Sequence, residues 1–345
     1  MAHRSVTRQT LHYFARRHTH VADRPVSDRA AWTPGSLGAW RETFDDAEVA
    51  ELDGAVEVAR RTGKPLYALQ TSDFPLPTLA ARIAGWRDQL AEGRGFVVVS
   101  GVPVDRWEED DCERFFWLLG RYLGTPGAQN PAGDLLGHVR DQGFSSQESV
   151  RAYRTNTEIK FHCDAADVVG LLCRTQAQSG GRSRIASSVS VFNALVERRP
   201  DLAPLLFEPF ALDTKAEGGV RYFLVPPCRF EGGKLRTFYH ADYFRSASRY
   251  SDVAALPPAR VELLDLYDQI ANELCLSMQL DPGDVQLLNN HTQVHAREKY
   301  IDGPDKRHLL RLWLSLKSGG GGNRRAWASL VGRFAWSRFT QPLRA

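Results

Sequence analysis

The sequence predicts a mainly β protein with added helices, in which two sheets form a jelly-roll core. Short apolar segments of strand length recur along the chain and are separated by turns that contain Gly or Pro, as is typical of such folds. Helical periodicity is confined to a few stretches, and the first of these precedes the first buried strand. We therefore expect an N-terminal helical cap and an inserted helical or loop segment around the strands.

The first half of the chain shows these signals in order. Residues 77–92 have apolar side chains at helical spacing, and residues 96–103 predict a buried strand that ends in a Gly/Pro turn. Residues 107–123 predict a second helix, whose acidic first turn suits the helix dipole. Residues 124–132 are expected to form a loop, and residues 136–140 a short strand.

The second half continues the alternation of strands and helices. Residues 168–173 predict a strand, and helices are expected over residues 190–199 and 261–280. Residues 222–243 are rich in polar aromatic side chains and form either a lid or ordinary strands. Further short strands are expected at residues 207–213, 220–225, 234–239, 284–288 and 307–316.

Composition and length set the organisation of the chain. With 345 residues, of which 43% are hydrophobic and 25% charged, it can bury one large core. We expect residues 1–75 to form an N-terminal extension and helical cap, residues 76–317 a jelly-roll domain with helical insertions, and residues 318–345 a Gly-rich linker with a basic tail. No apolar run reaches the roughly 18–20 residues that span a bilayer, and the start has no apolar signal segment. Five scattered cysteines indicate no disulfide framework. A cytoplasmic protein without a membrane partner is the expectation.

Both ends of the chain are basic, while the residues between them are acidic. Residues 1–25 contain five arginines and one aspartate, and residues 323–345 contain five arginines and no acid. The ends thus carry +4 and +5, and the net charge of +3 leaves −6 on the remainder. Basic arms can touch nucleic acid, acidic carrier proteins or membranes, or they are solvated or dock on the acidic body. The body lacks the interleaved basic and aromatic residues of strand-binding surfaces, so we expect no nucleic-acid partner. A carrier protein and a homo-oligomer both stay open beside a small-molecule substrate.

The strongest chemical signal is a pair of metal-binding side chains around Cys163. A strand places residues i and i+2 on one face, so His162 and Asp164 can bind one ion while Cys163 points away. A third ligand is expected further along the chain, where His291 and His295 compete. On one unbroken strand both histidines would share a face, so periodicity does not choose between them. Two imidazoles and one carboxylate leave the other side of an iron(II) ion free for a cosubstrate and dioxygen.

A second signal lies in residues 307–316. If this segment is a strand, Arg307 and Arg311 lie on one face of an otherwise apolar element. Buried guanidinium groups are costly unless anions meet them, and their planar fork matches a carboxylate. We therefore expect Arg307 to bind a dicarboxylic cosubstrate and Arg311 a second anion, with pairing to internal acids as the alternative.

Together these segments resemble the taurine dioxygenase-like (TauD/TfdA) family of iron(II)- and 2-oxoglutarate-dependent oxygenases, which is related to clavaminate synthase. The resemblance covers residues 96–316 and implies a double-stranded β-helix core of the cupin-like kind. The segments that carry it are Tyr153–Glu158, Phe161–Asp164, Ser179–Ser183, Asn289–His291 with His295–Arg297, and Arg307–Trp313.

The resemblance implies roles for individual residues. His162, Asp164 and His295 look like the catalytic iron ligands, which decides the choice of histidine in favour of His295. Ser183 and Arg307 look like the pair that holds the distal carboxylate of 2-oxoglutarate. The presence of Asp164 argues against halogenation, because halogenating relatives lack this carboxylate.

Substrate contacts are also implied. Arg311 resembles a position that contacts an acidic substrate group in several members, and Glu158 and Asn156 are similar to positions in the substrate pocket. Arg297 and Arg311 together indicate an anionic or amino-acid-like substrate.

The implied activity is that of a dioxygenase that uses Fe(II), 2-oxoglutarate and O2. It would oxidise, and most simply hydroxylate, an unactivated carbon of a small organic substrate, with CO2 and succinate as co-products. Desaturation, ring closure or action on a carrier-tethered substrate are alternatives within the same chemistry. A metal-binding jelly roll that serves as a sensor or scaffold is the alternative class. Ser183 and Arg307 argue against it, because a scaffold has no need of a dicarboxylate clamp.

Overall fold

A computed structural model describes residues 3–5, 7–9, 13, 22–130, 132–144, 154–215 and 220–316. The predicted linker and basic tail at residues 318–345, most of the basic N-terminal arm and Tyr153 lie outside the described residues.

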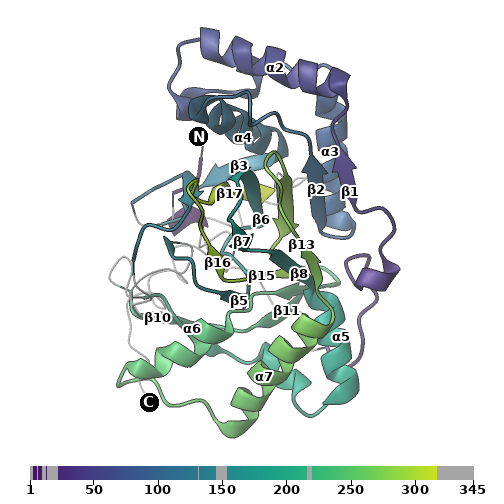
Figure 1. The fold of residues 1–345 in the computed structure, drawn as a ribbon. Coiled ribbons are helices and arrows are strands. Elements are labelled where there is room, and N and C mark those ends of the chain that lie inside the picture. The colour runs from purple at the N-terminus through teal and green to yellow at the C-terminus, as the bar shows by residue number, and fades with distance from the viewer. Residues whose placement is uncertain are drawn as a thin grey trace.

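Two sheets form the centre of the molecule (Figure 1). The larger has seven strands in the order β1-β2-β14-β6-β17-β3, with β4 also paired to β17, and the smaller has the order β13-β8-β15-β5. All pairings within them are antiparallel except β1 with β2. The strands of the larger sheet are β1 (Arg41–Thr43), β2 (Phe96–Ser100), β3 (Gly124–Gly127), β4 (Leu136–Val139), β6 (Val168–Thr175), β14 (Val285–Asn289) and β17 (His308–Leu316). Those of the smaller sheet are β5 (Ile159–His162), β8 (Ser183–Ser187), β13 (Leu276–Met278) and β15 (Gln293–Arg297).

The chain passes back and forth between the two sheets. From β5 it enters β6 in the larger sheet, returns to β8, and later runs through β14, β15 and β17 with a change of sheet at each step. This alternation is the double-stranded β-helix, so the predicted jelly-roll core is confirmed.

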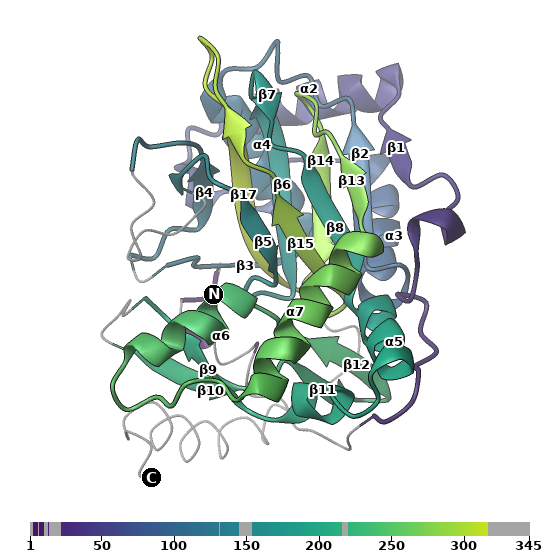
Figure 2. The ribbon, with the colours of Figure 1, turned by 60° about the horizontal axis from the view of Figure 1, so that its bottom comes forward.

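Helices cover both ends of this core, as Figures 1 and 2 show. One group packs on the outer side of the larger sheet: α2 (Asp46–Arg61), α3 (Leu79–Glu92) and α4 (Glu109–Leu123). The other group lies beyond the smaller sheet: α5 (Ser188–Arg198), α6 (Ala241–Ser246) and α7 (Pro258–Glu273). The helix α2 begins with a capping box, in which the Asp45 carboxylate accepts the Glu48 N–H at 2.8 Å and the Glu48 carboxylate accepts the Asp45 N–H at 3.0 Å.

Strand alternation sorts the apolar side chains into separate layers. In β17, Leu310 and Leu312 pack under the helices α2–α4, whereas Leu309 and Trp313 face the space between the two sheets. This is the division of faces that the period of two predicts for residues 307–316.

Three two-stranded ladders complete the fold. They are β9 (Phe210–Asp213) with β10 (Tyr222–Val225), β11 (Cys228–Glu231) with β12 (Lys234–Thr237), and β7 (Ser179–Gly180) with β16 (Tyr300–Ile301). Cys228, Phe230 and Leu235 are buried in the core beside α5 and α7. Residues 222–243 therefore contain ordinary strands.

Two expectations for individual elements are wrong. Residues 124–127 form the strand β3 and not a loop, because an edge strand tolerates Pro126 and its missing N–H. The helix expected to reach residue 280 ends at Glu273, and residues 276–278 pair with β8 as β13. In both places pairing with a neighbouring strand outweighs the local signal.

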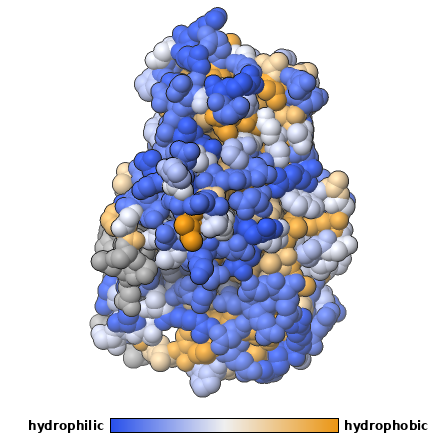
Figure 3. Space-filling view, viewed as in Figure 1, coloured by the Kyte–Doolittle hydropathy of each residue, from blue (hydrophilic) through white to orange (hydrophobic). Residues whose placement is uncertain are grey.

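No helix among the described residues is long and apolar enough to cross a bilayer. The face in Figure 3 is mostly hydrophilic, with scattered apolar residues.

The layer between the larger sheet and its helices should dominate stability. Leu287 of β14 is 1% exposed within it, whereas Leu224 of β10 is 42% exposed. We expect Leu287→Ala to lower the free energy of unfolding by about 2–5 kcal/mol and Leu224→Ala by no more than about 0.5 kcal/mol. Urea titrations of both variants measure the difference. Equal losses would contradict the assignment of this layer as the main core.

Candidate active site

Three side chains that can bind a metal ion meet between the sheets. His162 ends β5 and pairs directly with His295 of β15, and their ring centroids lie 4.1 Å apart. The carboxylate of Asp164 lies 4.0 Å from Nε2 of His162 and 3.8 Å from Nε2 of His295. The ligand atoms of all three lie within 4.8 Å of one another, so one ion can reach them all. Their side chains are only 11–13% exposed.

Both imidazoles can present Nε2 as a ligand. Nδ1 of His162 lies 2.9 Å from the carbonyl oxygen of Lys160, which only accepts, so Nδ1 carries the proton and Nε2 has a free lone pair. Burial, with the nearby His162, lowers the pKa of His295 to about 3. Among the described residues, Nδ1 of His295 has no hydrogen-bond partner. Neutral imidazoles of this kind suit a transition metal.

The Asp164 carboxylate is held in its charged form. Burial opposes the charge, but Arg311, the two imidazoles and the indole N–H of Trp313 outweigh it and hold the pKa of Asp164 below its usual value. The indole N–H donates to Oδ2 of Asp164 at 3.0 Å, and the guanidinium of Arg311 lies 3.9 Å from the same oxygen. The backbone N–H of Asp164 donates to the side chain of Asn290 at 3.0 Å. These contacts fix the direction of the carboxylate.

The competing histidine lies outside this cluster. Residues 290–292 form a turn between β14 and β15, so the strand is not unbroken. His291 sits in that turn, where Nε2 lies 2.8 Å from the carboxylate of Asp167 and the ring stacks on Tyr13 at 4.5 Å.

Two buried arginines form a second part of the site. Arg297 lies two residues after His295 and so on the same face of β15. Arg297 is 7% exposed and Arg307 is 5% exposed, yet within the described segments neither has an acidic partner within 4.0 Å. Both guanidinium groups lie over the ring of Tyr300, at 4.9 and 5.0 Å.

Part of the donor capacity of these arginines is unused. Arg297 donates through Nη2 to the backbone carbonyls of Thr155 and Thr157. Nε and Nη1 of Arg297 and Nη1 of Arg307 have no hydrogen-bond partner among the described residues. Burial and the charge of Arg307 lower the pKa of Arg297 to about 10, so both groups remain cationic at neutral pH. Two buried guanidinium groups without an acidic partner among the described residues are costly unless an anion binds to them.

The turn before β8 shapes the surroundings of Arg307. Gly181 has φ of +73°, and a Cβ there would lie 3.2 Å from Nε of Arg307. A side chain at this position would therefore press on the guanidinium. Ser183, which pairs in register with Arg297, is buried and donates to the side-chain oxygen of Gln286 at 3.1 Å. Ser183, Arg297 and Arg307 are thus polar groups in one buried region.

The remaining expected site residues fall into two classes. Arg311 is buried beside Asp164, and Gln129 braces it by accepting from Nε at 2.7 Å and donating to its backbone carbonyl at 2.9 Å. The side chains of Glu158 and Asn156 are exposed, and Glu158 pairs with Arg184 at 2.6 Å. The structure does not gather these two side chains around the metal cluster.

Sequence reasoning missed several residues that position the site. Trp313 shares a face with Arg311, so strand parity could have found it. Asn290, Gln129 and Tyr300 act through contacts that cross long stretches of chain and carry no local signal.

Several known proteins are similar to this chain. The family described as "Taurine catabolism dioxygenase TauD, TfdA family" matches residues 60–313. The chain is 31% identical over 307 residues to "Taurine hydroxylase-like protein SAT17" of Stachybotrys chartarum, covering 83% of this chain and 79% of the relative. It is 29% identical over 314 residues to "FR-33289 synthase" of Streptomyces rubellomurinus, covering 87% and 93%.

Solved structures share the fold at low identity. Asparagine oxygenase, in complex with Fe(II), 3-hydroxyasparagine and succinate, superposes with a TM-score of 0.66 at 17% identity, over 80% of this chain and 93% of its own. The non-heme iron oxygenase OrfP, in complex with Fe, succinate and (3S)-hydroxy-L-Arg, gives a TM-score of 0.60 at 15% identity, over 84% and 96%.

The expected family is confirmed, and with it the enzyme class and its cofactors. The chain belongs to the TauD/TfdA family and is an Fe(II)- and 2-oxoglutarate-dependent dioxygenase that uses O2.

Proposed function

We propose that His162, Asp164 and His295 bind the Fe(II), that Arg307 and Ser183 bind 2-oxoglutarate, and that the enzyme hydroxylates a small anionic or amino-acid-like substrate. One observation carries the proposal: a cluster of two imidazoles and a carboxylate shares a buried region with guanidinium groups that have no acidic partner among the described residues.

The metal part of the proposal rests on the donor set. Two nitrogens and one oxygen on one side of an ion match the non-heme iron oxygenases and leave other positions open. Bound Fe(II), with 2-oxoglutarate and O2, supplies the oxidising power to attack an unactivated C–H bond. The protein supplies orientation: Trp313 and Arg311 hold the charged Asp164 carboxylate in place, and the low exposure of the cluster limits access of water.

The cosubstrate part rests on Arg307. Its Nη1 has no hydrogen-bond partner among the described residues, and its planar fork matches a carboxylate. The hydroxyl of Ser183 now donates to Gln286, and rotation of the hydroxyl lets it donate to the same carboxylate.

The substrate part rests on the remaining cations. Within the described part of the chain, Arg297 keeps two donor atoms without a partner, and Arg311 lies beside the cluster of His162, Asp164 and His295. Either can hold an acidic substrate group. Taurine is an amino sulfonate, and the two solved neighbours hold hydroxylated amino acids. The compounds named for these relatives favour an anionic or amino-acid-like substrate for this chain.

Removal of the carboxylate ligand tests the metal assignment. We expect Asp164→Ala to lose both succinate formation and the visible absorption band that Fe(II) and 2-oxoglutarate form together without oxygen, because two imidazoles hold the ion too weakly. Asp242→Ala removes a carboxylate that is 47% exposed and pairs with Lys160, and it should keep both signals. An unchanged band and unchanged turnover in Asp164→Ala would refute the assignment.

The orientation of Asp164 can be tested without removing it. Trp313→Phe keeps an aromatic ring but deletes the N–H that donates to Asp164. We expect iron affinity or activity to fall about 10–100-fold, as for other partners of metal ligands. Trp107→Phe deletes a similar bond to Asp53 in the helical cap, and its iron affinity should match that of the wild type.

The clamp for 2-oxoglutarate can be separated from the metal. We expect Arg307→Gln to weaken 2-oxoglutarate binding about 10–100-fold, since a hydrogen bond to a charged group contributes roughly 1.5–3 kcal/mol. Iron affinity should stay the same. Arg307→Lys should fall in between, because it keeps the charge but not the fork. Anaerobic titration measures both ligands, with Arg260→Gln, at an ion pair with Glu208, as the control. Unchanged 2-oxoglutarate affinity in Arg307→Gln would contradict the clamp.

A further inference from the structure

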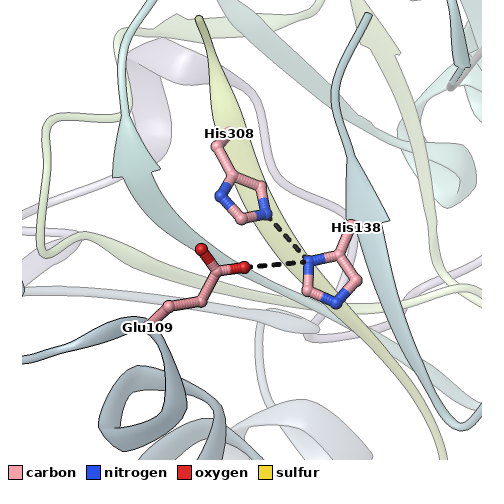
Figure 4. A group of neighbouring side chains, drawn as sticks. All are labelled: Glu109, His138 and His308. Carbon is pink, nitrogen blue, oxygen red and sulfur yellow. Dashed lines mark hydrogen bonds and ion pairs between the residues drawn. The ribbon is translucent and has the colours of Figure 1, made fainter. Parts of the chain in front are cut away.

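A second group of potential metal ligands lies on the outer side of the larger sheet. Figure 4 shows Glu109 from the first turn of α4, His138 from β4 and His308 from the start of β17 pointing toward one another. His308 follows Arg307 directly, but it faces α4 and not the space between the sheets. The group is therefore separate from the cluster around Asp164.

Its geometry resembles that of the proposed iron ligands. Nδ1 of His138 lies 2.9 Å from Nε2 of His308 and 3.8 Å from Oε1 of Glu109. All three ligand atoms lie within 4.8 Å of one another. Metal–ligand bonds of about 2.0–2.2 Å hold neighbouring ligand atoms about 3 Å apart, so a small closure would complete the site.

We propose that Glu109, His138 and His308 form a second site for a divalent transition ion. Two imidazole nitrogens and one carboxylate oxygen suit Zn²⁺, Ni²⁺ or Cu²⁺, whereas Ca²⁺ and Mg²⁺ prefer oxygen ligands alone. Water completes the coordination, because the side chain of Glu109 is 46% exposed.

Both acidic and basic side chains surround the site. Burial lowers the pKa of both imidazoles, to about 4 for His308. Burial and the negative charges of Glu109 and Asp110 raise the pKa of Glu113, which lies 3.6 Å from Nε2 of His138. The positive charge that pairs with Glu109 belongs to Arg174.

Arg174 competes with the ion. Its guanidinium donates to Oε2 of Glu109 at 2.8 Å and lies 3.0 Å from Nδ1 of His308. In that arrangement Nδ1 of His308 accepts, so its Nε2 holds the proton and donates to His138. A β-bulge places Arg174 here. His308 pairs with Thr175 and Leu309 pairs with Cys173, so Arg174 is the extra residue of β6 between these two pairs.

Metal binding therefore requires a change of tautomer. The proton of His308 moves from Nε2 to Nδ1, Arg174 turns away from Nδ1 and keeps its bond to Oε2 of Glu109, and Nε2 becomes a ligand.

Calorimetric titration of Zn²⁺ into the full chain tests the site. The background carries Asp164→Ala and His295→Ala, so that the first cluster cannot bind and oxygenase activity plays no part. We expect one Zn²⁺ per chain and a higher thermal midpoint with Zn²⁺. Adding His138→Ala or Glu109→Gln should weaken binding at least about tenfold, which is roughly 1.4 kcal/mol. His3→Gln, which removes an exposed histidine, should leave binding unchanged.

A third variant tests the role of Arg174. Arg174→Gln removes the competing cation, so Zn²⁺ should bind more tightly than in the background chain. Unchanged stoichiometry and affinity in both His138→Ala and Glu109→Gln would overturn the site. Weaker binding in Arg174→Gln would overturn the competition. Because Glu109 is half-exposed, Glu109→Gln stays informative even if His138→Ala does not fold.

Discussion

The pleat of β17 is the constraint on which the two faces of the larger sheet depend. Its inward side chains include Arg311 and Trp313, which hold Asp164, while its outward leucines pack under α4. A shift of one residue would exchange these sets, so that guanidinium groups would enter an apolar layer and leucines would face Asp164. Seven residues of β17 pair with β6, and both β3 and β4 pair with its other edge. This dense pairing is what fixes the register that the site needs.

The elements that could be predicted from the sequence are those with an uninterrupted local pattern. The helices α3 and α4 and the strands β2, β6, β14 and β17 have apolar side chains at the expected spacing. The strand β15 was harder to predict because His295 and Arg297 occupy inward positions where apolar residues would mark a strand. A strand with polar site residues at its inward positions does not show the alternation of apolar and polar residues by which strands are predicted. The helical cap was expected within residues 1–75, but the bounds of α2 could not be assigned, because its buried face consists of the small residues Ala55 and Ala59 with Leu52 and Val56.

The candidate site was predictable to the extent that it is local in sequence. His162 and Asp164 are two residues apart, so their proximity follows from backbone geometry. The spacing of His291 and His295 could not decide between them, because it does not reveal the turn at residues 290–292. The resemblance to the family favoured His295, which lies with His162 and Asp164 in the structure. The exposed position of Glu158 follows from its pairing with Arg184 across 26 residues, which no spacing rule reveals. Membership of the family determines the class of reaction. The identity of the substrate depends on contacts between residues far apart in the sequence, which spacing cannot predict.

The buried arginines affect how the binding of one ligand influences the binding of the next. The region holds three positive charges, on Arg297, Arg307 and Arg311, and one negative charge, on Asp164. These four side chains therefore carry a net charge of +2. A ferrous ion alone would double that excess, whereas a doubly charged keto acid would cancel the contribution of the ion. Metal and cosubstrate should therefore stabilise each other's presence, and an acidic substrate would bring the region closer still to electrical neutrality. With the proposed ligands at these residues, the charges favour the complete set over any one ligand alone.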